Sequence, residues 1–120
     1  MTGKVVSGKS RGTKIGFPTA NLEFLNGIRP SHGVYGSKVL VDGRIFDSVT
    51  NIGTNPTFDG GKSETVEVHI LNFDGRNIYN SNLHLRFLFR IRDEKKFSSV
   101  ENLKTAIRRD ISYYFSRVKD

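Results

Sequence analysis

The apolar residues of this chain follow two different periods, and the period changes near Phe97. Before that residue, short β-branched or alternating segments are separated by clusters of Gly, Asn, Asp and Pro. Segments of this kind are typical of β-strands, and six of them can be recognised. We predict strands over Gly3–Ser7, Thr19–Leu25, Val34–Val41, Arg44–Ile52, Thr65–Asn72 and Leu83–Ile91.

Three turn signals separate the later strands. Asp42-Gly43 is a strong two-residue hairpin signal, because both residues tolerate a positive φ. Asp59-Gly60-Gly61-Lys62 and Asp74-Gly75-Arg76-Asn77 mark looser connections. The strands are therefore expected to pair mainly with their neighbours in an antiparallel sheet.

A single amphipathic helix follows the strands. Ser98 with Glu101 three residues later predicts a capping box at its start. Apolar side chains then recur at spacings of three and four, which predicts about five helical turns with one apolar face. That face comprises Val100, Leu103, Ile107, Ile111, Tyr114 and Val118. We predict one mainly β domain over residues 1–120: a small six-stranded antiparallel barrel with the helix packed against it.

Composition excludes several classes of protein. The chain has no cysteine, which rules out disulfides, thiolate zinc sites and cysteine nucleophiles and fits a cytoplasmic setting. It also has no apolar run of the ~20 residues that a membrane span needs, so we expect no membrane partner. The net charge of +7 suits a solvated basic surface, a nucleic acid or a small polyanionic substrate. Without a stacking motif, we do not expect a nucleic-acid partner.

The segment from Gly8 to Asn21 carries the clearest sign of a ligand. Its glycines recur every fourth residue, and glycine lets the backbone approach a bulky anion closely. Thr19 and Asn21, two apart on a predicted strand, point to the same face and offer neutral oxygens to a hard cation. Together these features suggest a polyphosphate nucleotide with its Mg²⁺, although a polar turn before a strand explains Thr19 and Asn21 equally well.

An apparent P-loop near the N-terminus is rejected on physical grounds. The string from Gly3 to Ser10 matches G-x-x-x-x-G-K-[ST] in full. A P-loop, however, follows a buried strand and opens a helix, and neither condition is met here. Only two residues precede Gly3, and the glycines and Pro18 that follow Ser10 make a poor helix start.

Two other places could carry chemistry. Alternation puts Glu67 and His69 on the face opposite Val66, Val68 and Ile70, where Glu67 could act as a base in phosphoryl transfer or be an ordinary solvated carboxylate. The charged run that ends at Phe97 could hold an aromatic ligand through Phe97 together with Arg92 or Lys95, or be a plain connector.

The order and spacing of these motifs resemble those of the riboflavin kinases over essentially the whole chain. The pairing of Gly-Phe-Pro-Thr-Ala-Asn with Val-Glu-x-His-Ile, about fifty residues later, is the most specific part of the likeness. The matching strings are Gly16-Phe17-Pro18-Thr19-Ala20-Asn21, Gly33-Val34-Tyr35, Asn51-Ile52-Gly53-Thr54-Asn55-Pro56-Thr57-Phe58, Val66-Glu67-Val68-His69-Ile70 and Arg92-Asp93-Glu94-Lys95-Lys96-Phe97.

The resemblance implies a Greek-key barrel and transfer of the ATP γ-phosphoryl group to the 5′-hydroxyl of riboflavin, giving FMN and ADP. By position, Thr19 and Asn21 resemble the Mg²⁺ ligands, and Glu67 resembles the base on the 5′-hydroxyl. The remaining likenesses are Gly8, Lys14, Ile70, Asn72 and Tyr79 on the ATP side, and Arg92, Lys95 and Phe97 at the flavin end. Loops Lys9–Ile15 and Asp59–Ser63 are expected to close over the substrates.

The chain departs from the family pattern at three positions, and other functions stay open. Thr13 replaces a common arginine, Asn80 replaces a common glycine, and Asn72 stands where some relatives have histidine. Bacterial relatives usually carry an additional N-terminal FMN adenylyltransferase domain, so the chain can be a free-standing kinase or the kinase half of a bifunctional FAD synthetase. A non-catalytic flavin- or nucleotide-binding barrel and a single-strand nucleic-acid barrel are the other readings.

Overall fold

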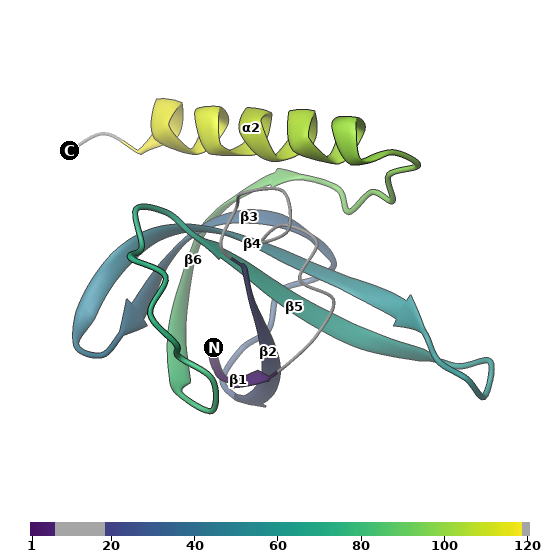
Figure 1. The fold of residues 1–120 in the computed structure, drawn as a ribbon, viewed down its shortest axis with the longest axis horizontal. Helices are drawn as coiled ribbons and strands as arrows, with labels where there is room; N and C mark the ends of the chain where they lie inside the picture. The colour runs from purple at the N-terminus through teal and green to yellow at the C-terminus, as the bar shows by residue number, and fades with distance from the viewer. Residues whose placement is uncertain (7–18, 119–120) are drawn as a thin grey trace.

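The computed structural model describes residues 1–6 and 19–118. Within them the chain forms six strands and one helix, in the predicted order (Figure 1). Their bounds are β1 Thr2–Val6, β2 Thr19–Asn26, β3 Gly33–Val41, β4 Arg44–Pro56, β5 Lys62–Ile70, β6 Asn82–Arg92 and α2 Val100–Arg117.

The strands close into a barrel in the order β1-β2-β5-β4-β3-β6, with β6 pairing back to β1. Every pairing is antiparallel. Strands β3, β4 and β5 follow one another, and β6 returns to lie beside β3, which is the Greek-key order. The predicted fold class is therefore confirmed.

The hairpin of β4 and β5 is longer than predicted, and Figure 1 shows it extending away from the barrel. The pairing continues beyond the expected ends through Gly53 with Thr65, Thr54 with Glu64 and Asn55 with Ser63. These residues are mostly polar on both faces of the hairpin. They therefore lack the alternation from which a strand is recognised.

The turns behave as their residues predict. Asp42 and Gly43 both have positive φ, at 48° and 80°, so they form the expected two-residue turn between β3 and β4. Asn80 has a φ of 69°, and asparagine tolerates this conformation better than most residues. The replacement of the family's glycine by Asn80 is thus compatible with the turn.

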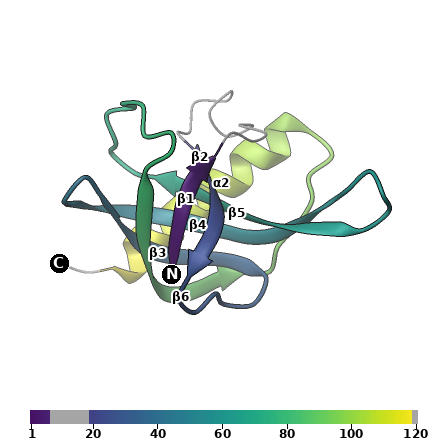
Figure 2. The same ribbon diagram turned by 90° about the horizontal axis from the view of Figure 1, so that it is seen from below.

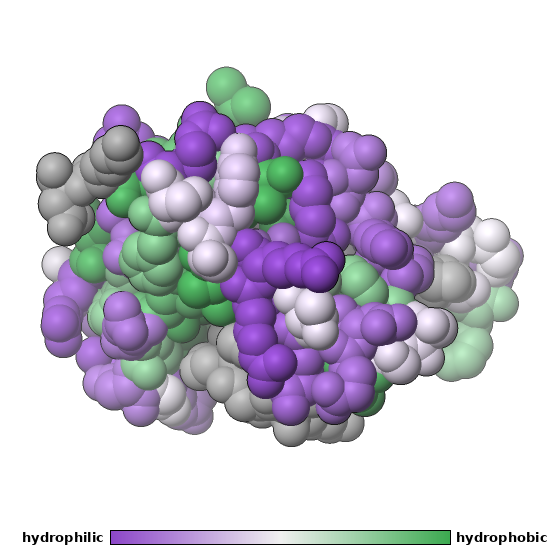
Figure 3. All heavy atoms as spheres, turned by 90° about the horizontal axis from the view of Figure 1, so that it is seen from above, coloured by the Kyte–Doolittle hydropathy of each residue, from purple (hydrophilic) through white to green (hydrophobic). Residues whose placement is uncertain are grey.

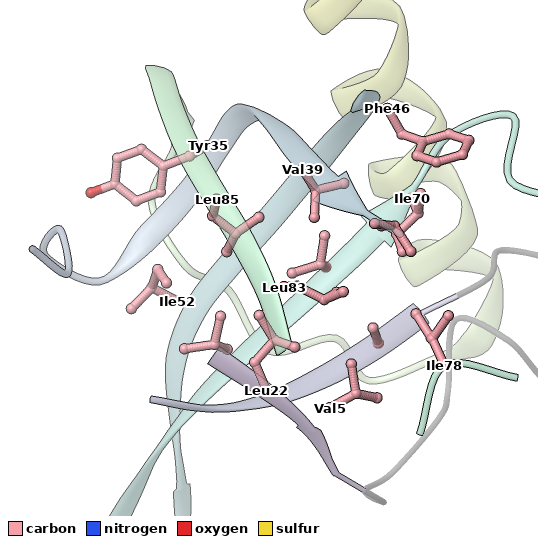
Figure 4. Close-up of a cluster of buried hydrophobic side chains, with 14 residues drawn as sticks. Val5, Leu22, Tyr35, Val39, Phe46, Ile52, Ile70, Ile78, Leu83 and Leu85 are labelled. Carbon is pink, nitrogen blue, oxygen red and sulfur yellow. The ribbon is translucent and has the colours of Figure 1, made fainter. Parts of the chain in front are cut away.

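Apolar side chains fill the inside of the barrel. Val39, Ile52, Val68 and Leu83 are completely buried, and Figure 4 shows side chains from different strands converging on this core. In β5 the core residues are Val66, Val68 and Ile70, so Glu67 between them faces outward. The barrel interior is a packed core that leaves the outer surface for ligands.

Helix α2 lies across the outside of the barrel, on the side away from β1 and β2 (Figures 1 and 2). Its cap differs from the prediction by one residue, because the side chain of Ser99, not Ser98, accepts a hydrogen bond from the Asn102 backbone N–H at 3.1 Å. The predicted apolar face is wrong at Val100, which is 48% exposed. Figure 3 views this side and shows hydrophilic side chains around smaller apolar patches.

Tyr114 is the main apolar anchor of the helix. Its side chain is completely buried, its ring stacks on Phe89, and its hydroxyl donates to Asp47 Oδ1 at 2.6 Å. Gly36 makes room for this contact, since a Cβ there would come within 2.6 Å of Phe89 and 2.9 Å of Tyr114. In the part of the chain that the structure describes, no helix is long and apolar enough to cross a membrane.

Candidate active site

Three polar side chains lie in a row across neighbouring strands. Glu67 in β5 is paired with Asn21 in β2 on one side and with Asn51 in β4 on the other. Side chains at directly opposed positions share a face and lie ≈ 4.5–5.5 Å apart at Cβ. Glu67 therefore stands between two asparagines on the outer surface of the barrel.

A cavity of about 220 Å³ opens between this outer surface and the start of helix α2. Glu67, Asn51 and His69 line its barrel wall, while Leu103, Ile107 and Asp110 come from the helix. Glu67 was expected to be either a base in phosphoryl transfer or an ordinary solvated carboxylate, and in the structure it lines a cavity. The third wall is the segment after β6, and it includes Arg92, Lys95 and Phe97.

The predicted metal ligand Thr19 is opposite His69, in the next row along the strands. Thr19 Oγ1 and His69 Nδ1 are 3.0 Å apart, at hydrogen-bond distance. Burial lowers the pKa of His69 to about 4, and the positive charge of Arg92 adds to this effect. His69 is consequently neutral at pH 7. When Nδ1 is the acceptor, the Thr19 hydroxyl donates to it and keeps its lone pairs for a cation.

The donors at this place suit a cation that arrives already bound to phosphate. Thr19 and Asn21 supply a hydroxyl and an amide oxygen on one face of β2, both neutral. Within residues 1–6 and 19–118, no group of three or more His, Asp or Glu side chains could hold a metal ion by itself. Mg²⁺ bound by few protein groups takes its other ligands from water and substrate phosphates, which fits this arrangement.

An ion pair joins two other walls of the cavity. Arg92 Nε and Nη2 donate to the two oxygens of Asp110, at 2.8 and 2.9 Å. Asp110 is only 4% exposed, so this pair joins the helix to β6 at depth. The Arg92 guanidinium also lies over the Phe97 ring, 5.6 Å from its centroid, and Lys95 lies at 5.7 Å. The three predicted flavin-end residues are thus together.

Glu94 and Lys96 attach the segment after β6 to the barrel. Lys96 Nζ donates to the Thr54 carbonyl at 2.8 Å and to Glu94 at 3.2 Å. The Glu94 carboxylate lies directly over Gly53, where a Cβ would come within 2.0 Å of it. Only glycine at position 53 allows this approach. The charged run is therefore a wall of the cavity.

Asp110 lines the cavity and was not predicted from the sequence. It stands three residues after Ile107 and four before Tyr114, on the apolar face of the helix. An acidic residue at such a position is rarely buried without a partner, and this was the available signal. Asn51 was also missed, because nothing in a single strand reveals which side chains will lie opposite it.

The residues predicted for the ATP side are not all in this cavity. Gly8 and Lys14, like Thr13 and the loop Lys9–Ile15, lie outside the described residues. Ile70 is buried in the barrel core. Asn72 and Tyr79 are exposed. The backbone N–H of Asn80 donates to Val5, which places Tyr79 beside the end of β1.

Comparison with known proteins gives a family for this fold and cleft. The family model for flavokinase, described as riboflavin kinase, matches residues 1–116. The chain belongs to the riboflavin kinase family. The resemblance inferred from the motifs is thereby confirmed.

Two curated members of the riboflavin kinase family show how far the similarity extends. The chain is 40% identical to the RNA-binding riboflavin kinase RibR of Bacillus subtilis, over 93% of this chain and 48% of the relative. It is 41% identical to the bifunctional riboflavin kinase/FMN adenylyltransferase of Haemophilus influenzae, over 91% of this chain and 35% of the relative. The chain therefore spans half or less of the length of these relatives.

A crystal structure described as a macrolide-efflux protein from Streptococcus pneumoniae has the same fold. It superposes with a TM-score of 0.88 at 36% identity, covering 98% of this chain and 38% of that chain. The barrel and its helix therefore match the fold of a solved structure.

Proposed function

We propose that this chain is an ATP:riboflavin 5′-phosphotransferase, which makes FMN and ADP. The observation that supports this most directly is the position of Glu67, between Asn21 on the cation side and the cavity on the other side. A carboxylate in that position can meet a substrate hydroxyl from the cavity and a phosphoryl group from the side of β2. Membership of the riboflavin kinase family supports the same substrates.

Glu67 accepts the proton of the ribityl 5′-hydroxyl while the 5′-oxygen attacks the γ-phosphorus of ATP. The new bond joins that oxygen to phosphorus, and the bond between phosphorus and the β–γ bridging oxygen breaks. ADP leaves with the electron pair of that bond. Positioning the alcohol and balancing charge are the main tasks in such a transfer.

Thr19 and Asn21 would hold Mg²⁺, which neutralises phosphate charge when it is bound. Because both ligands are neutral, they add no negative charge beside the triphosphate. In the tautomer whose Nδ1 is the acceptor, His69 accepts from the Thr19 hydroxyl and fixes its direction, the usual role of a group behind a metal ligand.

The flavin ring would lie at the far end of the cavity. Phe97 offers an aromatic surface there, and Arg92 and Lys95 supply positive charge close to that ring. The 2.8 and 2.9 Å bonds to Asp110 hold Arg92 in place. The ribityl chain then runs from this end along the barrel wall to Glu67. On the ATP side, Gly8, Lys14, Ile70, Asn72 and Tyr79 stay our predictions for contacts with the nucleotide.

The test is to incubate the purified protein with riboflavin, ATP and Mg²⁺ and to separate the flavins by chromatography. We expect FMN to form. Glu67→Gln should lower turnover by ~10²–10⁴-fold while riboflavin and ATP affinities change little, the usual effect of losing a positioned base. Flavin binding without any FMN would support the non-catalytic barrel instead.

Three further proposals concern the cellular setting. We infer a cytoplasmic enzyme that uses riboflavin and ATP without a nucleic-acid partner; the RNA-binding name belongs to a relative. Where a bifunctional arrangement like that of the Haemophilus influenzae relative applies, FMN made here would be the substrate of an FMN adenylyltransferase domain. Electrophoretic mobility of the protein with total RNA tests whether it binds a nucleic acid.

A further inference from the structure

Asn51 carries a buried oxygen to which no residue that the structure describes donates a hydrogen bond. Within the residues that the structure describes, Asn51 Oδ1 is the one buried side-chain polar atom with no hydrogen-bond partner. The buried hydroxyls of the barrel are different, since Ser37 bonds Ser48 at 2.7 Å and Thr50 at 2.8 Å. A buried acceptor without a donor destabilises a protein, so its presence requires an explanation.

Neighbouring cations of the cavity do not supply that donor. Arg92 is bonded to Asp110 and to the Asp93 carbonyl. Lys96 is bonded to the Thr54 carbonyl, Glu94 and the side chain of Asn55. Because Asn51 lines the cavity, the missing donor is best supplied by the molecule that enters it.

The position of Asn51 defines the chemistry of that donor. Asn51 is directly opposite Glu67, on the side away from Asn21. An amide oxygen beside a carboxylate repels phosphate oxygens, which makes this a poor place for the nucleotide. A neutral hydroxyl fits, because it donates to Oδ1 and can accept from the amide nitrogen.

We propose that Asn51 binds the ribityl hydroxyl next to the one that is phosphorylated, the 4′-hydroxyl, and thereby sets the 5′-hydroxyl against Glu67. This inference rests on the proposed function. Opposed side chains are close enough to hold two neighbouring hydroxyls of one polyol. Asn51 then makes the site selective for a hydroxylated side chain, beyond the recognition of the flavin ring by Phe97.

The test compares riboflavin with 4′-deoxyriboflavin as substrates. The wild-type protein should prefer riboflavin in kcat/KM by roughly 10- to 100-fold, since the deoxy compound leaves Oδ1 without a donor. Asn51→Ala should bring this preference close to one, by lowering kcat/KM for riboflavin and changing it little for the deoxy compound. Asn51→Asp keeps an acceptor of the same shape and should keep the preference.

A matched control is available on the same strand. Asn55 lines the same cavity, but its oxygen accepts from Lys96 at 3.3 Å. Asn55→Ala should therefore leave the preference between the two flavins unchanged. Thermal unfolding should show Asn51→Ala to be folded, because none of the described residues is hydrogen-bonded to the Oδ1 that is removed.

Two results would overturn the inference. One is an Asn51→Ala protein that still prefers riboflavin to the wild-type extent. The other is an Asn51→Ala protein that loses MgADP binding while its riboflavin binding is unchanged, because Asn51 would then contact the nucleotide. If the wild-type protein makes no FMN, the proposed function fails by itself. Quenching of flavin fluorescence then compares the two flavins, and equal Kd values for the wild-type protein would overturn the inference as well.

Discussion

Replacing Arg92 by alanine should destabilise the free protein strongly, before any ligand is considered. Arg92 makes two charge-assisted bonds to Asp110, whose side chain is almost entirely buried. Without Arg92, that carboxylate stays in the interface between helix and barrel and loses the cation to which it is bonded.

The size of the effect follows from the burial of the two partners. Breaking a buried ion pair from one side costs about 3–5 kcal/mol. The Arg92 side chain is 28% exposed, so water can reach part of the site and the lower end applies. We therefore expect a loss of about 3 kcal/mol, which for a domain of this size lowers Tm by roughly 10 °C.

Urea and thermal unfolding at pH 7, followed by circular dichroism, measure this loss. Arg76 provides the matched control, because its partners Asp42 and Asp74 are exposed, and Arg76→Ala should have a much smaller effect. Replacing Arg92 and Asp110 together by leucine should recover most of the stability, since no charge is then left buried. Equal effects of Arg92→Ala and Arg76→Ala would refute the reasoning.

Three other predictions concern the cation side, the helix contact and pH. Asn21→Ala should weaken MgADP binding far more than riboflavin binding, and equal effects in calorimetric titrations would argue against a metal role. Gly36→Ala should cost about 1–3 kcal/mol in urea unfolding, because the new Cβ would meet Phe89 and Tyr114 closer than 3.0 Å. Burial and the bond to Asp47 raise the pKa of Tyr114, so its contribution to stability is fully present below pH 10 and is lost progressively as the pH rises from 10 toward that raised pKa. Tyr114→Phe should flatten this alkaline decline, and identical pH profiles would contradict the assignment.

The fold was predictable because its signals are local. Alternation in β5 and the helical spacing after Val100 each follow from one segment, and they identified the elements correctly. The extended hairpin was not predictable in this way, because Thr54, Asn55 and Ser63 are all polar and show no alternation between apolar and polar side chains. What keeps them in a strand is pairing between β4 and β5, which no single segment encodes.

The site was predictable only in part, for a related reason. Alternation showed that Glu67 points away from the core, but it could not show that helix α2 would cover that face. The position of Asp110 depends on its contact with Arg92, which is 18 residues away in the chain. The position of Asn51 in the site depends on its pairing with Glu67, which is 16 residues away. Side chains that become partners only in the folded chain leave little trace in its sequence.

The packing of the barrel explains why the site lies outside it. Val39, Ile52, Val68 and Leu83 are fully buried in the interior, so no substrate can enter there. One outer face of a sheet cannot exclude water from a phosphoryl transfer, and a second wall is required. Helix α2 supplies that wall.

Two partly buried polar contacts hold helix α2 in this position, Tyr114 with Asp47 and Arg92 with Asp110. The second contact also orients a residue proposed to hold the flavin. Loosening the helix should therefore open the cavity and reduce turnover while the barrel stays folded. The same ion pair therefore contributes both to the docking of the helix and to the shape of the cavity.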